Sequence, residues 1–333
     1  MITPQTNTTL QKISEVITSH NSFAVCGHVN PDGDCLGAQL ALQRALSMLG
    51  KSVVGLLAKE ESIDHNLRFL PGSGELVFAD EYSDVPDVFI AVDVPSLERL
   101  GAAAAVHDRA GLTITIDHHA YDTSMAQYNY VDPDAAATCI LIWDLLGLLN
   151  ARDEQSALDA LTGLITDTGR FSFQNTDARA FSAASEMVSY GASPSLITRE
   201  FFQNRREASI ALEQRVLERR IYCENNAFVY SYLLQSDFEE CEAIKADAEP
   251  LIDTLRCISG VRIALILREN DKGEIRGSLR AKDDSDVAQV AVFFGGGGHK
   301  AAAGFTFKGT MEQALEKIPQ TVSELCFGRG ACL

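Results

Sequence analysis

Short apolar runs that alternate with helical patterns restrict the fold of this chain more than any other feature. An apolar run at residues 23–27 is followed by apolar residues at helical spacing from Leu36 to Leu49, where Gly50 provides a stop. Three further β-rich runs follow, SVVGLLA, DVFIAVDV and LTITID. Strands that alternate with helices in this way are typical of a parallel sheet. We therefore predict an α/β fold in which helices cover both faces of a parallel sheet.

A change of pattern in the second half predicts two further parts. Residues 135–220 are mainly helical, and the arginine- and glutamate-rich stretch at 199–220 is typical of one long, half-exposed helix. After Asn225 the runs AFVYSYLL, VRIALILRE, EIRGSLRA and AAAGFTF indicate strands again. We predict a larger domain at residues 1–190, a helical connector at 191–224 and a smaller α/β domain at 225–333.

The charge and hydropathy of the chain argue against several classes of partner. It has 28 basic and 46 acidic residues and a formal net charge of −18, and such an acidic surface repels long polyanions such as duplex nucleic acid. No apolar run approaches the roughly 20 residues of a membrane span, and the polar N-terminal stretch lacks a secretory pattern. The eight cysteines include no CxxC pair, which favours buried free thiols. We expect a cytoplasmic protein with no membrane partner and no long duplex partner.

Acidic and imidazole side chains gather in the loop after the first predicted strand. His28, Asp32 and Asp34 lie within HVNPDGD, where a proline and a glycine favour a tight bend. Ligands bind beyond the carboxyl ends of parallel strands, so the bend can direct all three side chains at one ligand. Either aspartate taken alone is also explained as the cap of the helix that begins near Cys35. A histidine and two aspartates in one loop favour a ligand site over that simpler explanation.

Charged side chains also end the next two strands and a later helix. Asp93 closes FIAVD and the triplet Asp117-His118-His119 closes LTITI, where a charge is costly unless it is paired or metal-bound. Asp167 ends an apolar helix, whose negative dipole end disfavours a carboxylate unless a cation is near. A helix cap at Asp93 and an exposed helix end at Asp167 are the simpler alternatives. Adjacent imidazoles beside a carboxylate indicate a metal or phosphate site.

A second kind of site is indicated near the end of the chain. Residues 295–298 are four consecutive glycines, whose backbone amides can approach an anion closely and form a phosphate-binding nest. His299 and Lys300 add donors, and Arg280 offers a planar fork of N–H groups. A glycine run alone is usually a flexible loop. Together with these donors it predicts an anion-binding loop.

The order and spacing of these motifs resemble the DHH superfamily of phosphoesterases. HVNPDGDCLG, the strand-ending aspartate, the DHH triplet and DTGRF are similar to successive motifs of its catalytic domain, and GGGGHKAAAGF is similar to the signature of its C-terminal substrate domain. The motifs span residues 28–305, and the compact chain is most similar to the nanoRNase and pAp-phosphatase type. The resemblance implies that the chain hydrolyses short oligonucleotides (nanoRNA, dinucleotides) and pAp at a centre of two Mn²⁺ ions.

The resemblance also implies a role for each motif residue. Asp93 would bridge the two ions, Asp117 would orient the histidines, and His119 would contact the scissile phosphate. The implied metal ligands are His28, Asp32, Asp34, Asp93, His118 and Asp167. The residues implied to hold the other phosphate of the substrate are Arg280, Gly297, Gly298 and His299.

The sequence leaves several alternatives open. A cyclic or linear di-AMP phosphodiesterase is barely separable from the oligoribonuclease, whereas an inorganic pyrophosphatase is less favoured because the glycine loop and Arg280 suit a nucleotide-sized substrate. An inactive nucleotide-binding regulatory module would be marked by a lost metal ligand, and all six positions are occupied here. The expected partners are short single-stranded oligonucleotides and nucleotide bisphosphates, with a homodimer as a further possibility.

Overall fold

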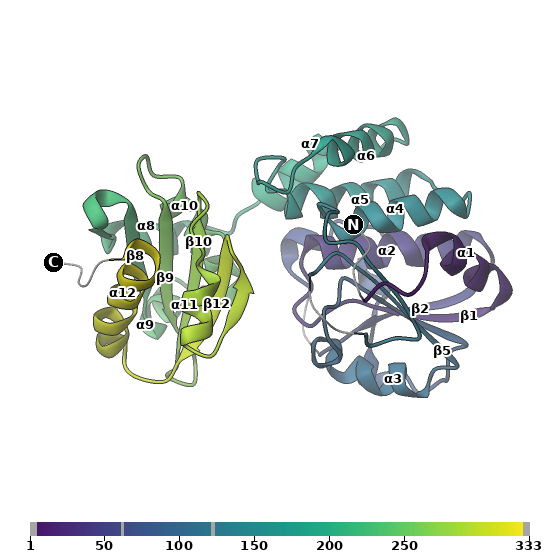
Figure 1. Cartoon of the computed structure of the whole chain (residues 1–333), viewed down its shortest axis with the longest axis horizontal. Coiled ribbons are helices and arrows are strands. Elements are labelled where there is room, and N and C mark those ends of the chain that lie inside the picture. Colours follow the sequence, from purple (N-terminus) through teal and green to yellow (C-terminus); the bar gives the residue numbers. More distant parts are fainter. Residues whose placement is uncertain (1–4, 61–62, 121–123, 329–333) are drawn as a thin grey trace. The chain divides into compact units, whose positions relative to one another are not determined.

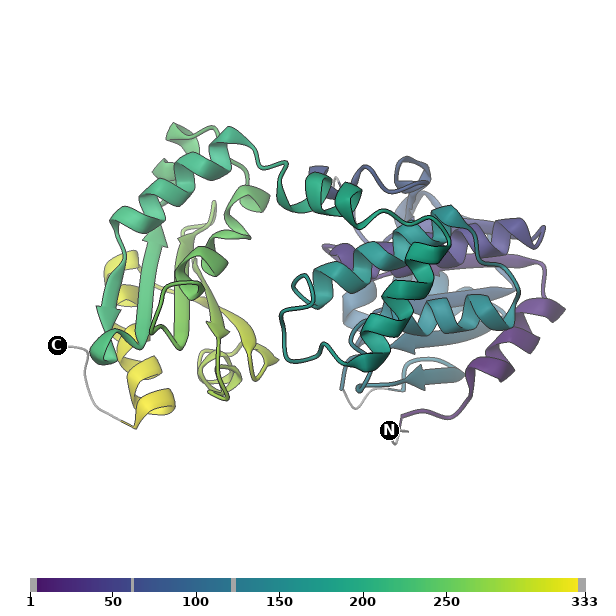
Figure 2. The same cartoon turned by 90° about the horizontal axis from the view of Figure 1, so that it is seen from above.

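The chain folds into two compact units, Met1–Asn204 and Arg205–Leu333 (Figures 1 and 2). The structure, a computed structural model, describes residues 5–60, 63–120 and 124–328. The boundary between the units follows Asn204 and so falls inside the stretch that the sequence analysis assigns to a connector. Each unit is built on its own six-stranded sheet.

The first unit contains a six-stranded parallel sheet with the strand order β3-β2-β1-β4-β5-β6. The register pairs every neighbouring strand in parallel. The strands are β1 Ser22–Cys26, β2 Ser52–Leu57, β3 Val77–Phe78, β4 Val88–Val92, β5 Leu112–Asp117 and β6 Tyr128–Val131. The chain order reverses between β1 and β4, and in such sheets the carboxyl ends at the reversal border a ligand-binding crevice.

Helices cover both faces of this sheet, as predicted (Figure 1). One face packs against α1, α2 and α4, with α5 and α6 lying behind them, and the other packs against α3 and the 3₁₀ turn that precedes it. The helices are α1 Leu10–Ser19, α2 Gly33–Met48, α3 Ala104–Arg109, α4 Thr138–Leu148, α5 Glu154–Asp167, α6 Ala178–Ser189 and α7 Pro194–Ile197. Short 3₁₀ turns occupy His65–Leu67, Ser73–Glu75, Ala79–Glu81 and Leu97–Ala103.

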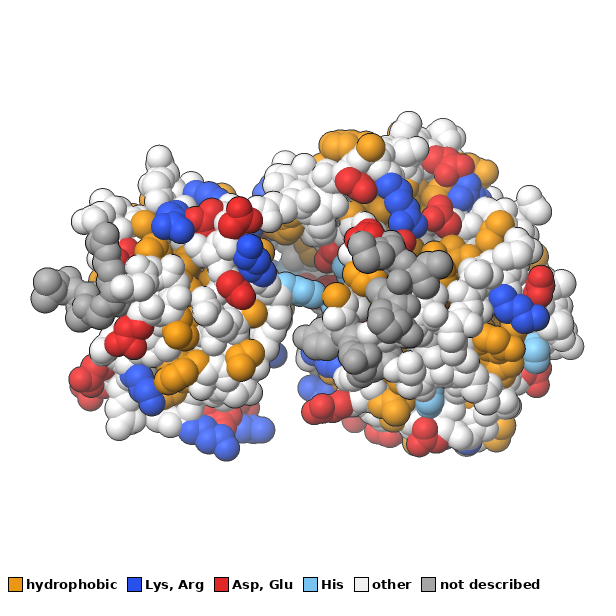
Figure 3. Space-filling model, in the orientation of Figure 1, with side chains coloured by type: hydrophobic (Ala, Val, Ile, Leu, Met, Phe, Trp, Pro, Cys, Tyr) orange, Lys and Arg blue, Asp and Glu red, His pale blue; other side chains and the backbone are white. Residues whose placement is uncertain are grey.

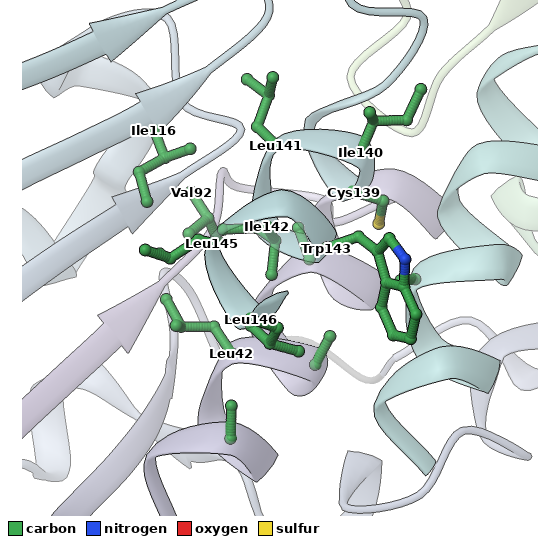
Figure 4. Packing of buried hydrophobic residues seen from close by; sticks show 14 of the residues in the cluster. Leu42, Val92, Ile116, Cys139, Ile140, Leu141, Ile142, Trp143, Leu145 and Leu146 are labelled. Carbon is green, nitrogen blue, oxygen red and sulfur yellow. The ribbon is translucent and has the colours of Figure 1, made fainter. Parts of the chain in front are cut away.

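Helix α4 is the centre of the first hydrophobic core. Figure 4 shows Leu145 beside Val92 of β4 and Leu146 close to Leu42 of α2. A helix that is apolar on nearly all sides must be enclosed by other elements, and α4 accordingly lies between the sheet and the outer helices. Trp143 closes the outer side, where its indole N–H donates to Glu186 Oε2 at 2.8 Å. The enclosed position fixes the amino end of α4 at the carboxyl edge of the sheet.

The second unit contains a mixed sheet with the order β11-β12-β10-β9-β8-β7, in which only β8 and β9 run parallel. The strands are β7 Ile221–Cys223, β8 Phe228–Leu233, β9 Ile263–Glu269, β10 Ile275–Ala281, β11 Gly297–His299 and β12 Ala302–Phe307. Helices α8 and α10 pack on one face, and α11 and α12 pack on the other. The helices are α8 Glu207–Glu218, α9 Gln235–Glu240, α10 Leu251–Arg256, α11 Ala288–Phe293 and α12 Met311–Phe327.

The long helix expected at residues 199–220 is interrupted. A π-helical turn spans Thr198–Phe202, and α8 begins only at Glu207 after an extended Arg206. The Arg206 guanidinium lies 2.6 Å from the Asp247 carboxylate. Local helix propensity is weak, and tertiary ion pairing of this kind overrides it.

The cysteines agree only in part with the expectation of buried free thiols. Cys26, Cys35 and Cys139 are buried and free, whereas the free thiols Cys241, Cys257 and Cys326 are partly or fully exposed. Cys223 on β7, in contrast, is disulfide-bonded. No spacing in the sequence predicts this bond, because pairing depends on tertiary proximity.

Charged side chains of both signs lie on the surface of each unit. In Figure 3 acidic and basic side chains are interspersed over the visible face of each unit. Among the described residues, no helix is long and apolar enough to cross a membrane.

Gly37 provides a test of the packing between α2 and α5. A Cβ at this position would lie 2.4 Å from the Asp159 carbonyl oxygen and 3.2 Å from Cys139 Sγ. We expect Gly37→Ala to lower the free energy of unfolding by about 1–3 kcal/mol, because the backbone of α5 at Asp159 must move away from the added methyl group. Gly74→Ala, where a Cβ meets no atom within 4 Å, is the control. Equal urea midpoints for the two variants would contradict this account.

Candidate metal centre

Five segments of the first unit converge at the carboxyl edge of its sheet. His28 follows β1, Asp93 follows β4, and Asp117 closes β5, so their side chains meet where the parallel strands end. Asp34 lies in the first turn of α2 and Asp167 ends α5. Segments that are far apart in the sequence are thus brought to one place.

Three groups of potential ligands overlap within this edge. They are His28 with Cys35 and Asp93, Asp93 with His118 and His119, and Asp34 with His118 and Asp167, and within each group the ligand atoms lie within 4.8 Å of one another. Asp93 belongs to two groups, and so does His118. The shared members join the three groups into one continuous cluster of potential ligands.

The Asp93 carboxylate is the middle of the cluster. It is 2% exposed, and His28 Nε2 lies 3.5 Å from one oxygen while His118 Nε2 and His119 Nδ1 lie 3.6 and 3.5 Å from the other. Its backbone is left-handed, with φ at 59°. A non-glycine residue holds such a conformation only where surrounding contacts enforce it, and these positions cluster at functional sites.

The amino end of α4 holds two of the carboxylates. Asp34 accepts hydrogen bonds from the backbone N–H groups of Thr138 at 2.7 Å and Cys139 at 2.9 Å. The Thr138 hydroxyl donates to Asp93 Oδ1 at 2.9 Å. Ala137, at the N-cap, has no side-chain acceptor, so Asp34 caps α4 from another helix. Sequence reasoning missed Thr138, and the poor cap before an apolar helix is the signal that could have revealed it.

Asp32 and Cys35 both lie close to His28, and either could in principle be a metal ligand beside it. Asp32 Oδ1 caps α2 by accepting from two backbone N–H groups, as the simpler sequence reading proposes, yet Asp32 Oδ2 still lies 3.7 Å from His28 Nε2. Burial raises the pKa of the Cys35 thiol to about 11, and thiolate is the form that binds metals. A carboxylate, unlike a protonated thiol, offers oxygen ligands at this place.

Backbone carbonyls orient two of the imidazoles. His28 Nδ1 lies 2.9 Å from the Val29 carbonyl and His118 Nδ1 lies 3.2 Å from the Ala135 carbonyl. An N–H donated there leaves the Nε2 lone pair of each ring directed at the carboxylates, which is the arrangement of metal-binding histidines.

Asp117 orients the third imidazole from behind. One of its oxygens accepts from His119 Nδ1 at 2.8 Å and from the backbone N–H groups of His118 and His119. Asp117 thus fixes both the loop and the ring, while its carboxylate belongs to none of the three ligand groups.

The glycine loop of the second unit forms a hairpin with β12. Gly297 and Gly298 lie on β11, and a Cβ at Gly298 would lie 2.5 Å from the Ala302 carbonyl oxygen. His299 and Arg280 both pair in register with Ala302, so they lie in one row across the sheet. Two strand spacings of about 4.8 Å separate β11 from β10, so the Cα atoms of His299 and Arg280 lie about 10 Å apart.

Comparisons with known proteins agree with both halves of the chain. The N-terminal domain of the DHH family matches residues 22–166, and the DHHA1 domain matches residues 225–326. The bifunctional oligoribonuclease and PAP phosphatase NrnA of Thermus thermophilus is 30% identical, over 95% of this chain and 94% of that one. This chain belongs to the DHH family. It is therefore a phosphoesterase, which confirms the family and the enzyme class predicted from the motifs.

Solved structures show the same architecture. An exopolyphosphatase-related protein from Bacteroides fragilis has a TM-score of 0.89 and 25% identity, with 95% of each chain covered. The exonuclease RecJ, in a structure bound to manganese, has a TM-score of 0.52 and 17% identity, with 94% of this chain and 93% of that one covered. At 17% identity, the likeness to RecJ is evidence only for a shared fold.

Two further residues of the DHH centre escaped the sequence analysis. Arg99 Nη2 lies 3.2 Å from His28 Nδ1. Asn175 donates to the backbone carbonyls of Asp167 at 3.1 Å and Ala136 at 3.0 Å, and it ties the end of α5 to the start of α4. Neither Arg99 nor Asn175 belongs to a sequence motif that predicts a ligand site.

Burial and repulsion among the carboxylates change their titration. Burial, and then the nearby Asp34, raises the pKa of Asp167 to about 8, and burial with Asp93 raises the pKa of Asp34 to about 6. Burial opposes a charged His118, but the carboxylates led by Asp93 raise the pKa of this imidazole to about 10. The three imidazoles lower the pKa of Asp93 despite its burial. Without a cation, protons therefore occupy His118 and Asp167 near neutral pH.

These shifts predict how metal affinity depends on pH. Binding needs a neutral imidazole and ionised carboxylates, so protons must leave, and affinity should rise with pH up to the raised pKa values. We expect the dissociation constant for Mn²⁺ to fall by at least about tenfold between pH 6 and pH 8, measured by indicator competition. Asp167→Asn, which removes the group with a pKa of about 8, should flatten the upper part of this profile. A constant affinity over this range would contradict the prediction.

Thr138→Val tests the support that α4 gives to Asp93. Valine keeps the shape and removes the hydroxyl donor 2.9 Å from the carboxylate. We expect metal affinity to fall by about tenfold to hundredfold, which is typical when a group that orients a ligand is lost. Thr162→Val is the matched control, because this buried hydroxyl bonds only to a carbonyl of its own helix. Metal titration that fails to separate the two variants would rule out this role for Thr138.

Proposed function

We propose that this phosphoesterase hydrolyses short oligonucleotides and pAp to mononucleotides, with two Mn²⁺ ions as its cofactor. The observation that carries the proposal is the buried cluster in which Asp93 and His118 are each shared between overlapping groups of ligands. The named activity of the Thermus thermophilus relative, which aligns over nearly the whole chain, supports the substrate class.

The donor set fits hard to intermediate divalent cations. Carboxylate oxygens and neutral imidazole nitrogens suit manganese, and the thiols nearby are buried and protonated. The residues that we propose as ligands are His28, Asp32, Asp34, Asp93, His118 and Asp167. Two such ions would supply an activated water and neutralise charge on the phosphoryl oxygens. The related RecJ structure that holds manganese supports this choice of metal.

His119 is the residue of this chain that we propose for direct contact with the scissile phosphate. Its pKa is raised although burial opposes the charge, because Asp117 accepts from its Nδ1. A protonated ring held through Nδ1 can present Nε2–H to a phosphoryl oxygen, and such a charged hydrogen bond is a strong one. Asp117 acts through His119 and is a positioning residue.

The second unit is proposed to hold the other phosphate of the substrate. Arg280 and His299 lie in one row across the sheet, and the glycine amides at 297–298 add backbone donors beside them. A site for one further phosphate suits short substrates, and the net charge of −18 disfavours long strands.

Asp93→Asn tests the proposed centre. The amide keeps the size of the side chain but removes the charge that the three imidazoles surround, so we expect loss of bound metal and at least about a thousandfold lower kcat. Asp159→Asn is the control, because this buried carboxyl lies on α5 outside the three ligand groups and burial raises its pKa. Metal analysis that finds Asp93→Asn fully loaded, together with retained activity, would refute the assignment.

A substrate panel separates the proposed activity from its alternatives. With Mn²⁺, kcat/KM should be highest for dinucleotides and pAp and lower for cyclic di-AMP, pyrophosphate and long single strands. If pyrophosphate or cyclic di-AMP were the best substrate, the proposed substrate class would be wrong while the metal centre could stand.

A further inference from the structure

The second unit contains a small pocket on the face of its sheet that α10 covers. Arg268 on β9, Ser278 and Arg280 on β10, and Glu249 line it beside apolar side chains of α10 and β9. Its volume is about 10 Å³, which is room for a single water. Arg280 is the proposed substrate residue discussed above, whereas no sequence motif contains Arg268.

Three arginines lie in or near this pocket, and they differ in whether a carboxylate pairs with them. Arg256 lies 3.0 Å from Asp253, and Arg268 lies 3.0 Å from Glu249. Arg280 donates to the carbonyl of the preceding residue at 3.0 Å, and among the described residues no carboxylate lies within 4.0 Å of it. Burial lowers the pKa of Arg280, and Arg256 and Arg268 act in the same direction, while Asp253 and Glu249 oppose the shift. Because no described carboxylate pairs directly with this half-buried guanidinium, an anion that accepts from it is favourable.

Arg268 is the second guanidinium that faces this pocket. It is 7% exposed, and its hydrogen bonds go to Glu249 Oε1 at 3.0 Å and to Ser278 Oγ at 3.3 Å. A guanidinium has five N–H donors, so these two bonds leave three of them for a further acceptor. The Glu249 side chain is 53% exposed and can move into water at little cost.

We propose that Arg268 and Arg280 together form a subsite for a terminal phosphate monoester, and that the Glu249 carboxylate occupies Arg268 until that phosphate displaces it. This inference rests on the proposed function, because the phosphate belongs to a short oligonucleotide or a nucleotide. A phosphate oxygen takes the place of the carboxylate on the same donors, and two planar forks suit a dianion. The pocket enlarges as Glu249 leaves. The subsite thereby selects short substrates that carry an end phosphate.

Kinetics with a matched pair of dinucleotides test the subsite. With Mn²⁺, Arg268→Gln should lower kcat/KM for pApA by about tenfold, the effect of one lost charged hydrogen bond, and change ApA by less than about twofold. Glu249→Gln should do the opposite and lower the KM for pApA by about twofold to fivefold, the effect of one exposed ion pair. Arg262→Gln is the control, because this arginine is paired with Asp283 and does not line the pocket.

Arg268→Lys and Glu249→Gln keep the test decisive if Arg268→Gln does not fold. Lysine retains the charge and loses the fork, so its effect on pApA should lie between those of the wild type and of glutamine. Equal effects of Arg268→Lys on pApA and ApA, or a raised KM for pApA in Glu249→Gln, would overturn the proposal.

Binding without metal separates this subsite from the proposed reaction. In the full chain with chelator, 5′-AMP should bind more tightly than adenosine, and this preference should decrease in Arg268→Lys and increase in Glu249→Gln. If these preferences hold while no oligonucleotide is hydrolysed, the subsite stands and the proposed function fails. If AMP and adenosine bind alike in every variant while oligonucleotides are hydrolysed, the subsite fails and the proposed function stands.

Discussion

The buried charge of Asp93 is the constraint on which the first unit depends. A carboxylate that is 2% exposed at the end of a central strand would be strongly destabilising without compensation. Compensation comes from imidazoles on two other segments and from the Thr138 hydroxyl at the start of α4. Each of these groups is in turn held by a carbonyl, a carboxylate or a helix end. The sheet edge, the left-handed backbone at Asp93 and the position of α4 therefore depend on one another.

The surrounding carboxylates make that arrangement favourable for cations. Burial, and after it repulsion from neighbouring carboxylates, raises the pKa values of Asp34 and Asp167, so positive charge nearby would stabilise their ionised forms. Protons can supply the missing positive charge, and divalent ions can supply it in their place. The second unit has the reverse balance, because the half-buried guanidinium of Arg280 has no carboxylate within 4.0 Å among the described residues. One unit thus favours cations and the other favours an anion.

Much of the architecture could be predicted because it follows from local pattern. The apolar runs that alternate with helical spacing predict the parallel sheet and the helices on both of its faces, and the return of strands after residue 225 predicts the second sheet. The break before Glu207 could not be predicted, because the extended Arg206 there pairs with Asp247, a residue distant in the sequence. The disulfide at Cys223 likewise depends on a proximity that spacing does not reveal.

The sequence by itself determined which acidic and imidazole residues of the first unit lie at one edge of its sheet. His28, Asp93 and the Asp117-His118-His119 triplet stand where strands end, and parallel strands must bring such ends to one edge. Only the tertiary structure decided how those side chains are supported. Thr138, Arg99 and Asn175 reach the centre from segments without a motif. Arg268 and Arg280 line one pocket, although the register of β9 and β10 pairs Arg268 with Arg276. Side chains that act through space leave no periodic or local signature, since their partners are set by packing rather than by neighbours in the chain.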